Sequence, residues 1–325
     1  MTGPVHSRRD HGGGIDAAAA RYGGARADWL DLSTGINPRP YPVTALPPEV
    51  WAALPDDAAM DRLLNAARRV WQVPDHLAIV AAPGSSAIIA QMPVLTRAAS
   101  VFIPGPTYNE HAAAFRAHGV PVTDDPGADA HVHVAPNNPD GRYVSADRIG
   151  GHPFTIIDES FGDCDPSRGY MAHADQDGLI ILKSMGKFWG LAGLRLGFAI
   201  GRPGTLAPSG RAALVDLLGP WAVSGPALTL GARMLEDLDW ATGTRSWLAE
   251  QSARLDRLMV GGQAAELVGG TTLFRTYAVN DAAALHDRLA RSHIWTRIFP
   301  YSRTWIRLGL PGHDADWARL EAALA

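Results

Sequence analysis

Lysine is nearly missing from this sequence. Among 29 basic residues only Lys183 and Lys187 are lysines, and they lie four positions apart. A general preference for arginine explains the other basic residues, but it does not explain why two lysines remain close together. Arginine cannot replace lysine where an amine must lose its proton and attack a carbonyl group. The segment that carries both lysines is therefore the first candidate for chemistry.

Cysteine, long apolar runs and an excess of one charge are missing as well. Because Cys164 is the only cysteine, no internal disulfide can form, and we expect a cytoplasmic location. No apolar run reaches the roughly 18 residues that cross a bilayer, and none follows the basic N-terminal residues as in a secretory signal. The net charge of −4 gives no reason to expect nucleic acid or an anionic membrane as a partner.

Two patterns that indicate other chemistry are incomplete. His131 and His133 alternate like metal ligands on a strand, but no cysteine, acidic residue or third histidine stands near them in sequence. We therefore interpret them as structural and expect no metal. Gly190, Gly193 and Gly197 do not fit the G-x-G-x-x-G pattern of a nicotinamide site.

The middle of the chain has short apolar runs that each end in a polar or glycine-rich turn. Helical patterns, clearest over 86–98 and 109–118, separate several of these runs. Buried strands that alternate with helices indicate an α/β domain with a mostly parallel sheet. Ligands bind beyond the carboxyl ends of such strands, so the residues after each run are site candidates. The runs are 77–82, 101–103, 131–135, 154–157, 179–182 and 196–200.

The pattern changes after about residue 225. Residues 228–258 read as one or two long helices. Residues from about 264 onward predict a smaller α+β unit with helices over 282–290 and 314–325. Residues 1–45 hold turn-rich polar segments with little core. We expect three parts, which are an N-terminal arm over 1–45, a large domain over 46–227 and a small C-terminal domain over 228–325.

Two residues at predicted strand ends suit catalysis. The apolar neighbours Phe188 and Trp189 disfavour a surface position for Lys187, and a Schiff-base lysine fits this place. Asp158 directly follows the run 154–157. A carboxylate there can hold a cofactor's pyridine nitrogen protonated, although a helix N-cap or a solvated turn would explain Asp158 by itself.

A phosphate site is indicated near the same strand ends. Gly84, Ser85 and Ser86 open a predicted helix, whose first N–H groups and two hydroxyls suit a phosphate. Arg195 and Ser184 flank the lysine segment, and a guanidinium grips a phosphate with two hydrogen bonds. An ordinary serine cap explains the glycine-serine turn equally well, and the turn is no Walker loop, because no Gly-Lys-Ser/Thr follows.

Four further residues are candidates for binding. The ring of Tyr108, after a predicted strand, is placed to stack on a flat cofactor. Asn138 stands in an Asn-Pro turn and can bond a ring hydroxyl, although a plain turn also explains it. Arg297 and Arg307 lie on either side of an aromatic-rich segment. They suit an anion site, and two solvated strand-edge arginines fit the spacing equally well.

Taken in chain order, these residues resemble the motifs of the fold-type I enzymes that depend on pyridoxal 5'-phosphate (PLP), the aspartate aminotransferase superfamily. The resemblance implies a PLP-dependent transferase-like α/β fold, with a mostly parallel seven-stranded sheet between helices in the large domain and a smaller α+β C-terminal domain. It implies that Lys187 carries PLP and that Asp158 stabilises the pyridinium. The residues that would bind PLP are Gly84, Ser85, Ser86, Tyr108, Asn138, Asp158, Ser184, Lys187 and Arg195.

Segments 11–15, 31–38, 220–224 and 305–311 resemble, more narrowly, the threonine-phosphate decarboxylases of cobalamin biosynthesis, close relatives of histidinol-phosphate aminotransferases. The resemblance implies decarboxylation of L-threonine O-3-phosphate to (R)-1-aminopropan-2-ol O-phosphate and CO2. It also implies a homodimer. The residues that would contact the small phosphorylated substrate are His11, Gly35, Ile36, Asn138, Arg297 and Arg307.

The chain departs from that family at four positions. Gly35 and Leu54 replace an asparagine and a tyrosine, Lys183 replaces an arginine, and Gly186 replaces a serine or threonine. In that family the asparagine and tyrosine side chains contact phosphate groups, and the glycine and leucine of this chain cannot make those contacts.

Two other functions remain open. An aminotransferase on a phosphorylated amino compound such as histidinol phosphate would use the same residues, because only the bond held perpendicular to the ring differs. A PLP-binding regulator without turnover usually carries a fused DNA-binding domain, and this chain has neither the basicity nor the extra length for one.

Overall fold

The computed structural model describes residues 11–325, which group into two compact units. We call residues 36–251 and 269–273 the large unit, and residues 11–35, 252–268 and 274–325 the small unit. Within residues 11–325, no helix combines the length and the apolar character needed to cross a membrane.

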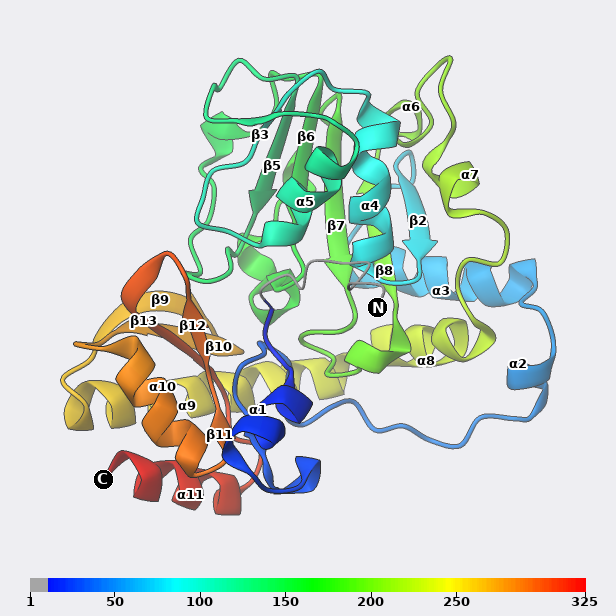
Figure 1. The fold of residues 1–325 in the computed structure, drawn as a ribbon. Helices are drawn as coiled ribbons and strands as arrows, with labels where there is room; N and C mark the ends of the chain where they lie inside the picture. The colour runs from blue at the N-terminus through cyan, green and yellow to red at the C-terminus, as the bar shows by residue number, and fades with distance from the viewer. Residues whose placement is uncertain (1–10) are drawn as a thin grey trace, which may run out of the picture. The chain divides into compact units, whose positions relative to one another are not determined.

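A seven-stranded sheet lies at the centre of the large unit (Figure 1). Its strands are β2 (Ala78–Ala82), β3 (Val101–Phe102), β4 (Val122–Thr123), β5 (Ala130–Val134), β6 (Phe154–Asp158), β7 (Leu179–Ser184) and β8 (Gly197–Gly201). They lie in the order β2-β8-β7-β6-β5-β3-β4. Only β8 runs antiparallel to its neighbours, β2 and β7. The predicted α/β fold with a mostly parallel seven-stranded sheet is confirmed.

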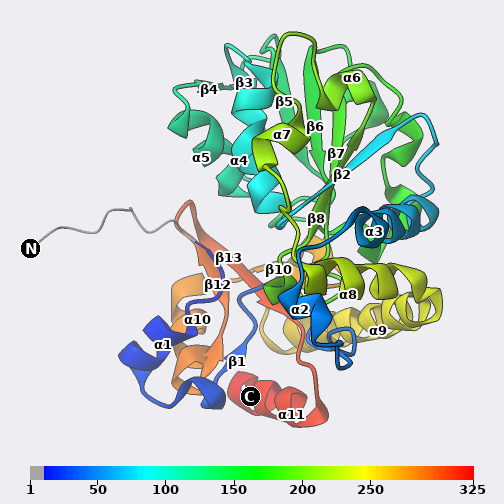
Figure 2. The same ribbon diagram turned by 90° about the vertical axis from the view of Figure 1, so that its right-hand side faces the viewer.

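The large unit also contains helices, several of which pack on this sheet. They are α2 (Glu49–Ala52), α3 (Asp57–Val70), α4 (Ser85–Thr96), α5 (Asn109–Ala117), α6 (Pro203–Leu206), α7 (Leu214–Leu218) and α8 (Gly225–Glu236). The sequence predicted α4 and α5 to within two residues. Ile88 and Met92 of α4 join the core cluster of Val132 and Ile156 from the sheet. Away from α4, α3 packs along α8 (Figure 2).

The alternation of side chains along the two central strands, β6 and β7, determines which residues face the site. Ile156, Ile157, Ile180 and Ile181 are all fully buried, as expected for parallel strands that are covered on both faces. Side chains alternate between the two faces of a strand. In β7, Ile180, Leu182 and Ser184 share the face that packs against α4, whereas Lys183 points to the opposite face.

The small unit is built around a second sheet, in the order β12-β13-β10-β9. Its strands are β9 (Glu266–Thr271), whose last residues belong to the large unit, β10 (Phe274–Ala278), β12 (Arg297–Phe299) and β13 (Ser302–Gly309). A parallel pair joins β1 (Leu30–Asp31) to β11 (Ile294–Trp295). The helices are α1 (Ile15–Tyr22), α10 (Ala282–Arg291) and α11 (Asp314–Leu324). The predicted helices over 282–290 and 314–325 are confirmed to within one residue.

The long helical segment predicted over 228–258 forms two helices. One is α8, and the other is α9 (Leu238–Gly262), which begins in the large unit and ends in the small one. They are separated by Asp237, whose Oδ1 accepts a hydrogen bond from Trp240 N at 3.0 Å. This bond caps the first turn of α9, because it satisfies an N–H group that has no partner within the helix.

Candidate active site

One pocket of the large unit opens at the carboxyl ends of β5, β6 and β7. It is lined by Ser85, Ser86, Tyr108, Asn138, Asp158, Ser184, Lys187 and Arg195, all predicted from the sequence to bind the cofactor. The sequence interpretation missed the lining residues Ser160 and Phe161. These two directly follow Asp158, so the same rule of strand ends would have found them.

Asp158, the last residue of β6, is held by two neighbours. His111 Nε2 donates to its Oδ2 at 2.9 Å, and Ser160 donates to its Oδ1 from the backbone N at 2.9 Å and from Oγ. Burial opposes the ionisation of Asp158, but these hydrogen bonds and the nearby His111 keep its pKa below the ordinary value. The pocket therefore contains a buried carboxylate that stays ionised at neutral pH.

An open cradle lies at the N-terminus of α4. Gly84 caps this helix with φ of 87°, and a Cβ there would lie 2.4 Å from Arg195 Nη2. A Cβ on Gly197 would lie 2.4 Å from Ser85 N. The two glycines thus let the guanidinium of Arg195 and the β8 backbone approach the start of α4 closely, and a guanidinium beside the first N–H groups of a helix suits an anion. Gly84 belongs to the predicted set but supports the pocket rather than lining it.

Tyr108 lines the pocket in front of α5, whose N-cap it forms. Burial, followed by the charges of Asp158 and Glu110, raises the pKa of Tyr108 to about 12, against a smaller opposing effect of a hydrogen bond with Ser86. The hydroxyl therefore stays protonated in the working range of pH, and the ring remains a neutral apolar surface for stacking.

Asn138 is held by the residue before it. Asn137 is almost fully buried, and its amide donates to Pro106 O at 3.0 Å and to Asp140 Oδ1 at 2.7 Å. Thr107 Oγ1 donates to Asn137 Oδ1. These bonds fix the turn that presents Asn138 to the pocket. The sequence interpretation missed Asn137, although both asparagines of this turn were visible in it.

The segment that carries Lys187 is anchored by Asn37. Asn37 N donates to Lys187 O at 3.0 Å, and Asn37 Nδ2 donates to Phe188 O at 2.9 Å. Lys187 Nζ lies 5.5 Å from the centre of the Phe161 ring. Asn37 was noted in the sequence only as part of segment 31–38, and its anchoring role needed the fold, since it lies about 150 residues from the lysine.

These features fit PLP. The glycine cradle with Arg195 suits the cofactor's phosphate, and the ionised Asp158 suits a protonated pyridine nitrogen. Lys187 lines the same pocket and supplies the amine that an aldehyde requires.

The small unit gathers the predicted anion-binding residues. Arg297 of β12 and Arg307 of β13 are direct partners in the antiparallel register. Arg307 is buried and its Nη2 donates to Ser33 O, while Arg297 Nη1 donates to His11 O at 3.0 Å. Burial, followed by the charge of Arg297, lowers the pKa of Arg307 to about 10. Like charges on facing residues are unfavourable, so an anion bound near them would stabilise this arrangement.

A cavity of about 370 Å³ lies beside these arginines and is lined by His11, Ser33, His286 and Arg297, among others. Arg307 does not line it. The remaining predicted substrate contacts, Gly35 and Ile36, lie where the chain passes from the small unit to the large unit.

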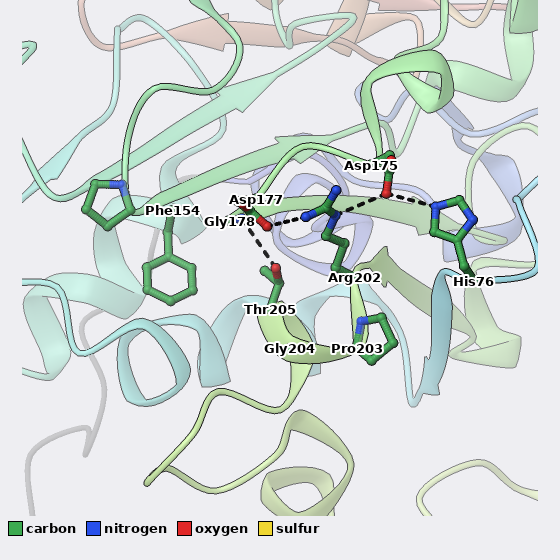
Figure 3. A pocket seen from close by; sticks show the side chains of 10 residues that line it. His76, Phe154, Asp175, Asp177, Gly178, Arg202, Pro203, Gly204 and Thr205 are labelled. Atoms are coloured by element: carbon green, nitrogen blue, oxygen red, sulfur yellow. Dashed lines mark hydrogen bonds and ion pairs between the residues drawn. The ribbon is translucent and has the colours of Figure 1, made fainter.

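A cavity of about 740 Å³ lies at the amino ends of β6 and β7 (Figure 3), and none of the predicted site residues lines it. In it, Arg202 bonds Asp175 at 3.0 Å and also Asp177, and His76 Nε2 lies 2.8 Å from Asp175 Oδ1. These four side chains are exposed and satisfy one another. The cavity therefore lacks the buried, converging polar groups of the other pocket.

Comparison with known proteins agrees with this geometry. The model of the family "Aminotransferase class I and II" matches residues 124–320. The chain is 41% identical to threonine-phosphate decarboxylase from a Sinorhizobium species and 38% identical to that from Pseudomonas aeruginosa, in each case over 97% of both chains. The chain belongs to the class I and II aminotransferase family.

A solved structure shows the same fold. Histidinol-phosphate aminotransferase from Sinorhizobium meliloti, in complex with pyridoxal-5'-phosphate, superposes on this family member with a TM-score of 0.76. The two are 20% identical, and the match covers 96% of this chain and 93% of the other.

The histidines of β5 have structural surroundings in this aminotransferase-family chain. His131 stacks on His152 with ring centres 3.4 Å apart and bonds Pro126 O at 3.0 Å. Burial lowers the pKa of His133 to about 4, so its ring is uncharged at neutral pH. Across residues 11–325, no cluster of three or more His, Cys, Asp or Glu side chains is arranged to hold a metal ion.

Proposed function

We propose that this protein is a PLP-dependent carboxy-lyase that converts L-threonine O-3-phosphate to (R)-1-aminopropan-2-ol O-phosphate and CO2, in cobalamin biosynthesis. The similarity to threonine-phosphate decarboxylases over 97% of the chain carries the choice of substrate. The pocket at the ends of β5 to β7 supports the choice of cofactor, since one cavity brings together an anion cradle, an ionised carboxylate and a lysine.

Each part of the cofactor has a partner in the pocket. We assign the phosphate to Ser85, Ser86, Ser184 and Arg195, the ring nitrogen to Asp158, the ring hydroxyl to Asn138, the ring face to Tyr108 and the aldehyde to Lys187. Bound PLP supplies an electron sink for the electron pair that remains when a bond to the substrate Cα breaks.

The protein's own groups manage charge and protons. Asp158 stays ionised, because His111 and Ser160 stabilise its charge, and it would therefore keep the ring nitrogen of bound PLP protonated. When CO2 leaves, the amine of Lys187, which lines this pocket, or a water would return a proton to Cα. Asn37 fixes the backbone of Lys187 and so limits where that amine can reach.

The substrate carries two anionic groups, a carboxylate and a phosphate. We assign them to Arg297, Arg307 and His11, together with Gly35, Ile36 and Asn138. The facing arginines of β12 and β13 support this assignment, since a bound anion would relieve the repulsion between them.

Measurement of CO2 tests the reaction. Purified protein loaded with PLP is incubated with L-threonine O-3-phosphate, and we expect stoichiometric CO2 and aminopropanol phosphate without any keto acid. Amine exchange that needs a keto acid and releases no CO2 would instead establish the aminotransferase. PLP binding without either reaction would indicate a regulator.

Covalent labelling tests the cofactor lysine independently of the substrate. Treatment of the PLP-loaded protein with borohydride, followed by peptide mapping, is expected to label Lys187 and to leave Lys183 unlabelled. Lys187→Ala is expected to abolish both the label and CO2 release. Activity retained in Lys187→Ala would remove this lysine from the mechanism.

A cytoplasmic homodimer is part of the proposal. Trp51, Leu54 and Trp221 are large apolar side chains that are more than half exposed. Their segments lie together, since a Cβ on Gly225 would come within 2.3 Å of Val50 O. An exposed apolar patch of this kind supports burial against a second copy. Light scattering is expected to give twice the chain mass of 34.6 kDa.

A further inference from the structure

Lys183, the second of the two lysines, lies on the face of the sheet opposite to the cofactor pocket. Its side chain is 6% exposed. In the alternation of β7 it points away from Ser184, which lines the pocket. Lysine is almost never buried without a partner. The chain otherwise uses arginine, yet it keeps a buried lysine here. Because this side chain points away from the cofactor pocket, direct contact with the cofactor does not explain the lysine.

Two carboxylates pair with this lysine. Lys183 Nζ forms an ion pair with Glu159 Oε2, and it lies 3.6 Å from Asp163 Oδ1. Burial opposes the charge on the amine, but the two carboxylates together keep the pKa of Lys183 above its ordinary value. All three side chains are buried. One cation and two anions therefore form a network that is shielded from water, on the face of the sheet opposite to Ser184.

Glu159 connects the network to the catalytic carboxylate. It is the residue after Asp158, and its backbone N donates to Leu182 O at 2.9 Å. Tyr170 N donates to Glu159 Oε1, and Gly162 N donates to Glu159 O at 2.8 Å. A displacement of the Glu159 side chain therefore strains the segment that positions Asp158.

Asp163 connects the network to the lysine segment. Its Oδ1 accepts a hydrogen bond from Trp71 Nε1 at 2.9 Å, and its Oδ2 accepts one from Trp189 Nε1 at 2.8 Å. Trp189 is fully buried and stacks on Trp240 with ring centres 5.4 Å apart. Because Trp189 follows Lys187 by two residues, Asp163 limits the movement of the segment that carries the cofactor lysine.

We infer that Lys183 is a positioning residue, which holds Glu159 and Asp163 and through them keeps Asp158 and Lys187 in the geometry that the cofactor requires. The inference rests on the proposed cofactor roles of Asp158 and Lys187.

Gly162 packs closely against the pair formed by Lys183 and Glu159. A Cβ added to Gly162 would lie 3.0 Å from Glu159 Cβ and 3.4 Å from Lys183 Nζ. The ammonium group thus occupies a closely packed site.

Two substitutions change the charge of the network in opposite directions. Lys183→Met leaves two buried anions without a cation, whereas Glu159→Gln removes one anion and keeps the shape of the side chain. Buried charges act over several ångströms because water screens them poorly. Extra negative charge favours the protonated form of the nitrogen that joins Lys187 to PLP, and the loss of an anion disfavours it.

The pH midpoint of the visible absorption band of the PLP-loaded protein reports this protonation. We expect the midpoint to rise by about one pH unit in Lys183→Met and to fall by a similar amount in Glu159→Gln. The dissociation constant for PLP is expected to increase about tenfold in Lys183→Met, because Asp158 and Lys187 lose their common support.

Arg275→Met serves as the matched control. Arg275 pairs with Asp256 at 2.7 and 2.9 Å within the small unit. Its loss is expected to lower the melting temperature of the apoprotein and to leave the band midpoint unchanged. If both network variants behave like this control, Lys183 is only structural and the inference is wrong. If Lys183→Met does not fold, the shift in Glu159→Gln decides the question.

These readouts require no substrate, so the inference and the proposed reaction fail in different ways. A wild-type protein that binds PLP but releases no CO2 would reject the proposed reaction and leave the predicted band shifts standing. A wild-type protein that binds no PLP would reject both.

Discussion

His111 Nε2 lies 2.9 Å from Asp158 Oδ2, and both side chains are almost completely buried. Among residues 11–325, the other ring nitrogen of His111, Nδ1, has no hydrogen-bond partner. Because an ionised carboxylate can only accept, Nε2 is the donor in the bond to Asp158. His111 belongs to α5, which begins directly after Tyr108. The start of this helix therefore positions two residues, Tyr108 for the proposed stacking on the cofactor ring and His111 for the bond to Asp158.

The His111→Phe variant is expected to weaken catalysis more than folding. Phenylalanine keeps an aromatic ring but cannot donate a hydrogen bond to Asp158. Hydrogen bonds to charged groups contribute about 1.5–3 kcal/mol, which corresponds to roughly a 10- to 100-fold loss of kcat. Steady-state CO2 release measures kcat, and circular dichroism checks the fold. An unchanged kcat would show that Ser160 alone is sufficient to hold Asp158.

The low pKa of Asp158 predicts an acid-dependent contribution to stability. Its value in the folded protein lies below the 3.8 of the unfolded chain. The ionised form therefore stabilises the fold fully above about pH 3.8, and this contribution is lost as the pH falls through the lower folded-state value. Urea unfolding of the apoprotein and of Asp158→Asn is expected to give a difference in unfolding free energy that shrinks below pH 3.8. A constant difference would contradict the assigned ionisation.

Gly197→Ala is expected to impair PLP binding, because its Cβ would lie 2.4 Å from Ser85 N and would push the start of α4 out of place. We expect the dissociation constant for PLP to rise about 10- to 100-fold. Gly193→Ala is the matched control, since a Cβ at Gly193 meets nothing within 4 Å. Fluorescence titration of the apoproteins with PLP compares the two, and equal affinities would reject the cradle as the phosphate site.

Arg307→Met is expected to raise KM for L-threonine O-3-phosphate about 10- to 100-fold, because a charge-assisted contact to a substrate anion is lost. The absorption spectrum of bound PLP should not change. Arg303→Met removes an exposed arginine from the same strand, β13, and is expected to leave KM unaltered. A KM for Arg307→Met that equals the control's would move the anion site elsewhere.

The strand ends were predictable from the sequence because the signals are local. A buried parallel strand reads as a short apolar run, and the polar residue after it falls at the edge of the sheet where ligands bind. Asp158 follows such a run, and Ser184 ends another. The pocket that the structure places at these ends contains both residues, together with Tyr108, Asn138 and Lys187. Their roles toward PLP and substrate remain predictions.

The supporting residues were not predictable in the same way. His111 meets Asp158 across 47 positions, Trp71 meets Asp163 across 92, and Asn37 reaches Phe188 across 151. Neither periodicity nor motif spacing carries such a pairing, since each depends on how distant helices and strands close around the sheet.

By itself, the sequence determined the α/β class, the mostly parallel sheet and the residues able to do chemistry, because apolar periodicity and short motifs are properties of neighbouring residues. Only the tertiary structure decided which of these side chains share a cavity and which partners hold them. It also decided that the two lysines have different environments. Four positions apart, Lys187 lines the pocket, whereas Lys183 is closed in with two carboxylates on the other face of the sheet.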